Sequence, residues 1–256
     1  MMIAACAFML AGCDKENDDA QSPGKDMDVA IEVTSASGDS AAIIGKINQF
    51  REHAGNPLNS TPITNGGRRE INWDGVPADF TSPKAFPATF FNATEKDAPD
   101  GRKRGLIYQP ANTSLLVSET NFAEIDTTFK SQFKAFSKAK LFSPKGTNVS
   151  EIIFMLPGTN TPAYVTSFGV IFADVDHAES TYIDAYQDDK LLGRYKASVA
   201  NKGFSFVGLH THKYKITRIK ITSGNTALAP NIQDGPQKDL VVLDDLIYSE
   251  PVALKK

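Results

Sequence analysis

Seven short apolar runs in the second half of the chain constrain its fold more than any other feature. Each is rich in β-branched and aromatic residues, and Gly, Pro, Asn or Asp separates it from the next, which is the pattern of β-strands joined by turns. The runs are EIIFML (151–156), YVTSFGVIFADV (164–175), TYIDAY (181–186), LLGRYKASV (191–199), GFSFVGL (203–209), YKITRIKITSG (214–224) and LVVLDDLIY (240–248). The series predicts an all-β protein.

Two of these runs indicate how the sheets are built. In YKITRIKITSG, Ile219 and Ile221 share one face while Arg218 and Lys220 share the other, as in an antiparallel sheet with one buried and one wet side. The segment YQDDKLLG (186–193) predicts a β-hairpin, with Asp188 and Asp189 forming the turn.

Two segments depart from the strand pattern. IGKINQFREHAG (44–55) predicts a short helix ending at Gly55, and FKSQFKAFSKAKLF (129–142) predicts either a helix facing the core or a loop held by its phenylalanines. Residues 56–112 are rich in proline and predict long loops. With no composition break inside 43–252, we expect one domain, an antiparallel β-sandwich of jelly-roll type with long loops and one or two short helices.

Charge and cysteine content exclude several classes of function. The net charge is -3 and the lysines and arginines are scattered, so no basic stripe predicts binding to nucleic acid. Both cysteines, Cys6 and Cys13, lie at the start of the chain. The body of the protein therefore has neither a disulfide framework nor a cysteine nucleophile or ligand.

The first residues resemble a bacterial lipoprotein signal. An apolar segment (1–12) ends in LAGC, similar to a lipobox, which implies cleavage before Cys13 and lipidation of that residue. The acyl chains would anchor the protein to a membrane. Residues 13–42 predict a disordered acidic tether, because they begin with a run of charged and polar residues. We expect a cell-envelope location, most simply the outer membrane facing outside. Retention at the inner membrane and a frayed cytosolic N-terminus are the alternatives.

The order of short motifs is similar to that in a family of secreted or lipid-anchored bacterial β-sandwich proteins with no assigned activity. The resemblance covers residues 49–251 and includes GRREINWDGVP, LFSPKGTNV, GFSFVGL and LVVLDDLIY. The last of these also resembles the closing strand of jelly-roll modules, many of which bind carbohydrate and hold a structural calcium. These resemblances imply a fold more than a function.

Two pairs of aspartates are candidate calcium ligands. Asp174 and Asp176 lie two apart in a strand, so both side chains are expected on one face, at the rim of the buried row of Phe168, Val170 and Phe172. Asp244 and Asp245 interrupt an apolar strand, one on each face, and a buried carboxylate needs a partner. Calcium takes oxygen ligands of this kind. The alternative is that these aspartates bond the backbone of their own turns.

The stretch RREINWDGVP (68–77) holds the only tryptophan, Trp73, and two candidate ligand-binding arginines, Arg68 and Arg69. An exposed Trp73 would offer a platform for a sugar ring, whereas a buried one would pack in the core with its N–H bonded. The alternation of Ile71 and Trp73 favours a half-buried structural strand, with the arginines pairing with the aspartates above.

Motifs for catalysis are lacking. GFSFVG does not have the spacing of a nucleophile elbow, and the acids offer no defined pair of the kind a glycosidase needs. His210 and His212 lie two apart, a spacing used by metal sites, but a solvated hairpin is the simpler interpretation. We therefore expect an extracellular binding module, for glycan, with a structural calcium. A polysaccharide-acting enzyme and a purely structural envelope protein are the alternatives.

Overall fold

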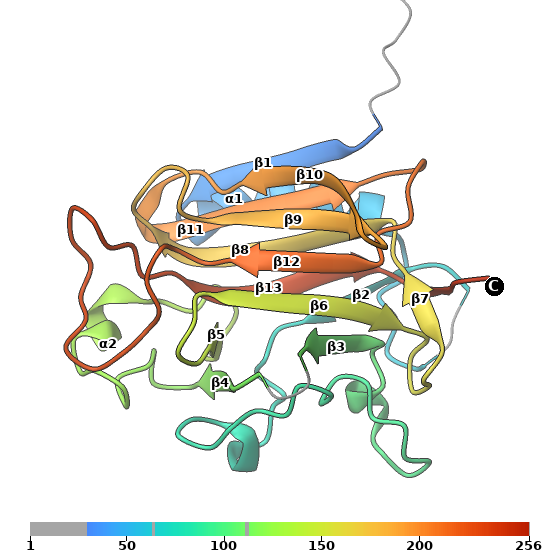
Figure 1. The fold of residues 1–256 in the computed structure, drawn as a ribbon, viewed down its shortest axis with the longest axis horizontal. Coiled ribbons are helices and arrows are strands. Elements are labelled where there is room, and N and C mark those ends of the chain that lie inside the picture. The colour runs from blue at the N-terminus through green and yellow to red at the C-terminus, as the bar shows by residue number, and fades with distance from the viewer. Residues whose placement is uncertain (1–29, 63–64, 111–112, 256) are drawn as a thin grey trace, which may run out of the picture.

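The structure, a computed structural model, describes residues 30–62, 65–110 and 113–255. It is a mostly β protein in which two antiparallel sheets lie one against the other, with helix α1 (Ser40–Ala54) behind one of them (Figure 1). The all-β prediction is therefore confirmed at the level of two antiparallel sheets and two short helices.

The first sheet, here called the inner sheet, has apolar residues packed against both of its faces. Its strands follow the order β1, β11, β8, β13, β5 and β4, and β2 also pairs with β13. Their bounds are Glu32–Gly38 (β1), Arg68–Ile71 (β2), Leu115–Ser118 (β4), Leu141–Pro144 (β5), Ser167–Val175 (β8), Ala200–His210 (β11) and Val242–Ser249 (β13).

The second sheet, the outer sheet, has one face toward the inner sheet and the other toward solvent. Its strands follow the order β10, β9, β12, β6, β7 and β14, and β3 also pairs with β6. Their bounds are Leu106–Gln109 (β3), Val149–Met155 (β6), Pro162–Tyr164 (β7), Tyr182–Gln187 (β9), Lys190–Lys196 (β10), Arg218–Thr222 (β12) and Val252–Ala253 (β14).

The larger core lies between the sheets. Phe142, Phe168 and Tyr248 of the inner sheet meet Ile152 and Phe154 of the outer sheet there, all at most 1% exposed. Burying side chains of this size stabilises the fold by about 1.5–3 kcal/mol each. A second core on the far face of the inner sheet explains why every residue of β8 and β13 is buried.

Helix α1 provides much of that second core. Asp39 caps its start, accepting a hydrogen bond from the backbone N–H of Ala42 at 2.8 Å, and Gly55 ends it with φ 112°. The ring of Phe50 lies so close to the glycine pair of β8 and β11 that a Cβ atom on Gly208 would be 2.6 Å from it. The helix predicted for 44–55 is confirmed and begins four residues earlier, at Ser40.

The phenylalanine-rich segment 129–142 forms one helical turn and then a loop. Helix α2 covers only Phe129–Gln132, and the chain enters β5 at Leu141. Phe129 and Phe133 are fully buried in the second core. Of the two interpretations of this segment, the loop held by phenylalanines describes most of it.

All seven predicted strands are present, as β6 and β8 to β13, and Gln187 pairs with Lys190 across the predicted turn. The loop-rich stretch 56–112 contains the short strands β2 and β3 and two 3-10 turns, Ala78–Phe80 and Asp100–Arg102.

The predicted tether, 13–42, ends too late in the sequence. Strand β1 pairs with β11 along its whole length and α1 begins at Ser40, so the folded part already includes these residues. The signal segment 1–12 and Cys13 lie outside the described residues. No helix among residues 30–62, 65–110 and 113–255 combines the length and the apolarity that crossing a bilayer requires.

Candidate metal centre

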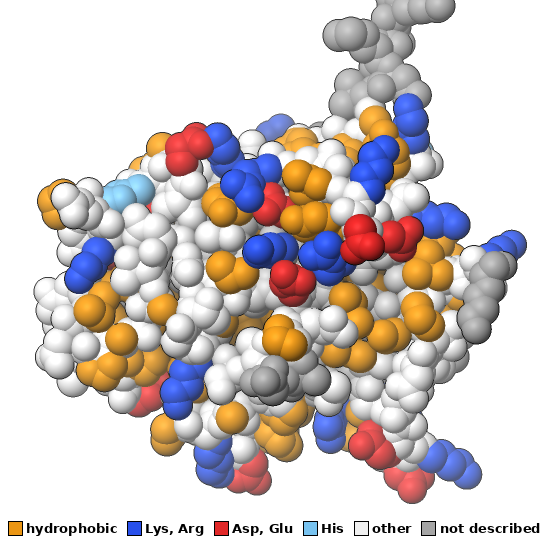
Figure 2. Space-filling view, in the orientation of Figure 1, with side chains coloured by type: hydrophobic (Ala, Val, Ile, Leu, Met, Phe, Trp, Pro, Cys, Tyr) orange, Lys and Arg blue, Asp and Glu red, His pale blue; other side chains and the backbone are white. Residues whose placement is uncertain are grey.

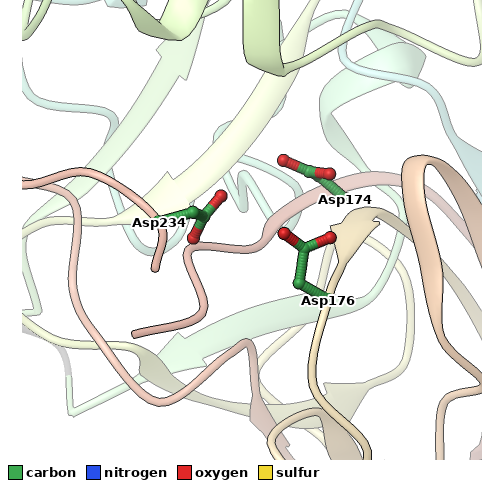
Figure 3. Close-up of side chains that lie close together, drawn as sticks. All are labelled: Asp174, Asp176 and Asp234. Atoms are coloured by element: carbon green, nitrogen blue, oxygen red, sulfur yellow. The ribbon is translucent and has the colours of Figure 1, made fainter. Parts of the chain in front are cut away.

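Three carboxylates converge where β8 ends. Asp174 and Asp176 come from the end of β8 and Asp234 from the loop 223–241 between β12 and β13, and their oxygens lie within 4.8 Å of one another. Figure 3 shows the three side chains directed toward a shared space. We call these residues the acid cluster. Two of them were predicted as a pair, and Asp234 was not.

A backbone irregularity aims Asp174 at the cluster. Its φ of 68° lies in the left-handed region, and the pairing of β8 with β11 shifts register at this point. Val175 therefore points into the core between the sheets, in line with Phe172. The prediction that Asp174 and Asp176 would continue the row of Phe172 is wrong because this bulge interrupts the strand alternation.

Backbone and amide donors hold the three carboxylates in place. Lys202 N–H donates to Asp174 at 2.6 Å, and Asn201 Nδ2 donates to Asp176 at 2.8 Å. Asp234 accepts from the backbone N–H of Leu240 at 2.6 Å and from the side chain of Gln132 in α2. The cluster therefore joins four separate parts of the chain, which are the end of β8, the start of β11, the loop 223–241 and helix α2.

A fourth acid, Asp239, anchors the turn that follows β8. It is fully buried, and its carboxylate accepts from the backbone N–H groups of Asp176 and His177 at 3.0 and 3.2 Å. The hydroxyl of Ser180 donates to it as well. Asp239 thus holds the backbone of Asp176 and His177 in place and adds negative charge beside the cluster.

The charges in the cluster repel one another. Burial, with the Asp174, Asp176 and Asp239 carboxylates beside it, raises the pKa of Asp234 to about 7. Burial and the neighbouring Asp176 also raise the pKa of Asp174. In the described part of the chain, none of the three forms an ion pair with a lysine or arginine. The cluster therefore concentrates negative charge that no ion pair offsets within the described residues, although Lys202 also lines the adjoining cavity.

A surface cavity of about 300 Å³ adjoins the acid cluster. Its lining is polar and includes Gln132, Asn201 and Gln233 beside the three aspartates. Carboxylate and amide oxygens around an open cavity are the ligands that a hard divalent cation takes, with water completing the set. The arrangement can hold a metal ion.

The second predicted aspartate pair, Asp244 and Asp245, forms a separate site. The hydroxyl of Ser137 contacts both carboxylates, at 3.0 Å from Asp244 and 2.7 Å from Asp245, and Phe136 N–H donates to Asp244 at 2.6 Å. We call Asp244 and Asp245 the acid pair. The expectation that they point to opposite faces is wrong, because β13 shifts register between Leu243 and Leu246 and brings both to Ser137.

The acid pair is closed to solvent. Asp244 is fully buried and Asp245 is 4% exposed. Burial, with Asp245 alongside, holds the pKa of Asp244 well above its usual range, and burial raises the pKa of Asp245 too. Such a pair shares a proton and fastens the loop after α2 to β13. The structure does not bring it to the acid cluster, so the four predicted calcium ligands divide between two places.

Trp73 lies in the core. It is 1% exposed, its ring stacks on Phe142 at 4.3 Å, and its indole N–H donates to the carbonyl oxygen of Asp244 at 2.8 Å. Strand β2 ends at Ile71, before Trp73, whose φ is 61°. The structural interpretation of this residue is confirmed. Trp73 also lines a mainly apolar cavity of about 220 Å³ together with Phe90 and Phe91.

The two arginines before Trp73 pair with glutamates. Arg69 is fully buried and forms two hydrogen bonds of 2.8 Å with Glu250, and Arg68 donates to Glu70 at 2.7 Å. Arg51 of α1 contacts Glu70 too, at 2.9 Å, which ties the helix to β2. The prediction that Arg68 and Arg69 pair with the aspartate pairs is wrong, and Arg69 has no exposed surface for a ligand.

His210 and His212 are in contact at the end of β11. Their Nε2 atoms lie 3.0 Å apart, and His210 is only 8% exposed. The interpretation as a solvated hairpin therefore holds for His212 and is wrong for His210.

The solvent-facing side of the outer sheet carries tyrosines covered by arginines. The guanidinium of Arg194 lies 3.8 Å from the ring centre of Tyr182, and that of Arg218 lies 3.8 Å from that of Tyr186. Figure 2, which views this side of the molecule, shows basic and acidic side chains interspersed with apolar ones. Aromatic and charged groups thus share one exposed face.

Comparison of the chain with protein families, with curated proteins and with solved structures found no match. The resemblance to secreted and lipid-anchored bacterial proteins accordingly stays a prediction.

Proposed function

We propose that this protein is a lipid-anchored binding module of the bacterial cell envelope, a jelly-roll-like β-sandwich that binds calcium at the acid cluster and glycan on an exposed surface. One observation carries the proposal: Asp174, Asp176 and Asp234 place carboxylate oxygens within 4.8 Å of one another. Like charges at this spacing repel unless a proton or a cation lies among them. A divalent cation removes the repulsion and links the loop 223–241 to β8.

Calcium fits this site better than the common alternatives. It takes six to eight oxygen ligands at about 2.3–2.6 Å and tolerates irregular geometry. Two of the three carboxylates come from the end of a strand and one from a long loop, and the amide side chains of Asn201 and Gln233 line the same cavity. Zinc would favour nitrogen or sulfur ligands, and no histidine ring or cysteine belongs to the group.

The experiment for the calcium site is a calorimetric titration of Ca²⁺ into the purified protein at pH 7.5. The wild type should bind one calcium ion per chain. Replacing Asp176 by Asn removes one charged ligand and should weaken binding at least tenfold. Asp97→Asn, which changes an exposed aspartate outside the cluster, should leave binding unchanged. Equal binding by the two variants, or no binding by the wild type, would contradict the proposal.

The glycan part of the proposal is supported by half-buried tyrosines and the arginines that cover them on the solvent-facing side of the outer sheet. Tyr182 and Tyr186 lie four residues apart in strand β9, on the same face of the sheet, and each is covered by an arginine. Aromatic rings beside polar hydrogen-bond donors suit the alternating apolar and hydroxyl surfaces of sugars.

Affinity electrophoresis tests glycan binding. Gels cast with dextran or with polygalacturonate present a neutral and an acidic polysaccharide, and we expect retardation in at least one. Changing both Tyr182 and Tyr186 to Ala should abolish it. Unretarded migration in both gels would count against glycan binding while leaving the calcium site intact.

The lipid anchor is tested separately. Growth with a labelled fatty acid should label the wild-type protein and leave Cys13→Ser unlabelled. Incorporation of label into Cys13→Ser would refute lipidation at this residue. The enzyme alternative receives no support from the acid pair, because its carboxylates are closed to solvent.

A further inference from the structure

Three of the four histidines and one glutamate meet at one end of the inner sheet. His210 ends β11, His212 follows two residues later, His53 lies in the last turn of α1, and Glu32 opens β1 directly opposite His210. The ring centres of His53 and His210 are 5.5 Å apart, and His53 Nδ1 lies 3.8 Å from the Glu32 carboxylate. Residues distant in sequence thus form two neighbouring pairs of possible metal ligands, His210 with His212 and His53 with Glu32.

The closest contact in this group is between two ring nitrogens. Nε2 of His210 and Nε2 of His212 are 3.0 Å apart, with the rings at 86° to each other. Two protonated nitrogens would repel at this distance, so at least one of them presents a lone pair. A tetrahedral zinc ion with Zn–N bonds of about 2.0–2.1 Å holds two nitrogens about 3.3 Å apart. The pair needs to open by only a few tenths of an ångström to chelate a metal.

The hydroxyl of Ser167 orients the ring of His210. It lies 2.7 Å from His210 Nδ1 and 3.5 Å from the carbonyl oxygen of His53. In the tautomer in which Ser167 accepts the Nδ1–H of His210, the Nε2 lone pair faces His212. Metal-binding histidines are oriented in this way by a hydrogen bond from the other ring nitrogen.

His210 is shielded from water, with only 8% of its surface exposed. Glu32 and His53 have side chains that are 53% and 38% exposed. Both can turn toward an ion held by Nε2 of His210 and Nε2 of His212.

We propose that His210 and His212, completed by Glu32 and His53, bind a transition-metal dication such as Zn²⁺. Imidazole nitrogens with one carboxylate form a common zinc ligand set. The site is distinct from the acid cluster in position and in ligand type, so it does not depend on the proposed calcium site. A bound ion would join β1, α1 and β11 at the end of the sheet where the chain enters the fold.

The test is a calorimetric titration of Zn²⁺ into the full chain at pH 7.5. Every chain in this experiment carries Asp234→Asn, which weakens the acid cluster, so that zinc bound there does not obscure binding at the histidines. We expect one zinc ion per chain, bound at least tenfold more weakly by His212→Ala, whose changed residue is exposed. His177→Ala, which removes the fourth histidine, should bind as the parent does. No zinc binding, or equal binding by His212→Ala and the parent, would overturn the proposal.

A spectroscopic measurement identifies the ligands independently. Cu²⁺ added at one equivalent should give an electron paramagnetic resonance spectrum with hyperfine coupling to at least two nitrogens, and His212→Ala should lose one of them. A spectrum showing oxygen ligands alone, or one unchanged in His212→Ala, would contradict the assignment. His212→Ala should bind calcium with the same affinity as the wild type.

Discussion

The acid cluster and the acid pair contain the same side chains in opposite surroundings. Asp174, Asp176 and Asp234 line an open polar cavity and accept hydrogen bonds, and the described residues form no ion pair with them. Asp244 and Asp245 are buried and share the hydroxyl of Ser137. Because a buried pair can share one proton, it needs no metal. The cluster has three carboxylates, of which Asp174 is buried and the other two are half-buried, and one shared proton cannot satisfy all three, so the cluster can hold a cation.

The largest expected difference between the two regions comes from Ser137→Ala. This change removes the hydroxyl shared by two buried carboxylates, and we expect the free energy of unfolding to fall by about 2–3 kcal/mol. Urea unfolding measures it. Ser131→Ala removes the exposed hydroxyl of a serine that lines the cavity at the acid cluster, and it should change stability by less than about 0.5 kcal/mol. Equal stability of the two variants would mean that the acid pair does not depend on Ser137.

A smaller effect of opposite sign is expected at the acid cluster. In EDTA at pH 7.5, Asp234→Asn should stabilise the protein by about 1 kcal/mol, because it removes one of three repelling charges. A fully buried group would contribute about 1.4 kcal/mol for each unit of its pKa shift. The expected effect is smaller because Asp234 is partly solvated, and solvent screens its charge. Asp97→Asn is the matched control and should have no effect. Destabilisation by Asp234→Asn in EDTA would show that its charge is already compensated.

The pH dependence of stability follows from the same residue. The pKa of Asp234 is about 7 in the folded protein, whereas an ordinary aspartate has a pKa of 3.8. Between these pH values the folded protein therefore binds one proton more than the unfolded chain. Stability contributed by this group is therefore complete below about pH 4 and is lost as pH rises toward 7. In metal-free buffer, the difference between wild type and Asp234→Asn should grow over this interval. A difference independent of pH would be inconsistent with the raised pKa.

The smallest effect is expected at the only tryptophan. Trp73 touches the acid pair through the carbonyl of Asp244 and does not contact the acid cluster. Calcium should leave its emission maximum unchanged, whereas Ser137→Ala should shift the maximum to longer wavelength as water reaches the ring. A calcium-dependent shift in the wild type would mean that the two regions are coupled.

The sequence predicts the sheets well because their signals are local. The alternation of apolar and polar residues in 214–224 and the apolar runs of β8 and β13 can each be recognised from a few consecutive residues. The alternation fails at Asp174 and at Asp244, where bulges change the direction of the side chains. A bulge depends on the partner strand, so the sequence of one strand does not predict it.

The partners of the charged residues depend on tertiary structure. Glu250 lies 181 residues from Arg69, and nothing in either segment indicates their pairing. Asp234 follows Gln233 in a loop without strand or helix signals, so its place in the acid cluster was not predictable from the sequence. His53 and Glu32 join the histidine pair only because α1 folds over the end of β1 and β11.

The most direct test of the calcium site is a thermal melt of the wild type and Asp234→Asn at pH 7.5, in Ca²⁺ and in EDTA. At about 100 times its dissociation constant, a ligand that binds only the folded state stabilises it by about 2.7 kcal/mol. We predict that the wild type melts at a higher temperature in calcium than in EDTA and that Asp234→Asn shows a much smaller difference. Identical wild-type melting temperatures in calcium and EDTA would contradict the assignment of the acid cluster as a calcium site.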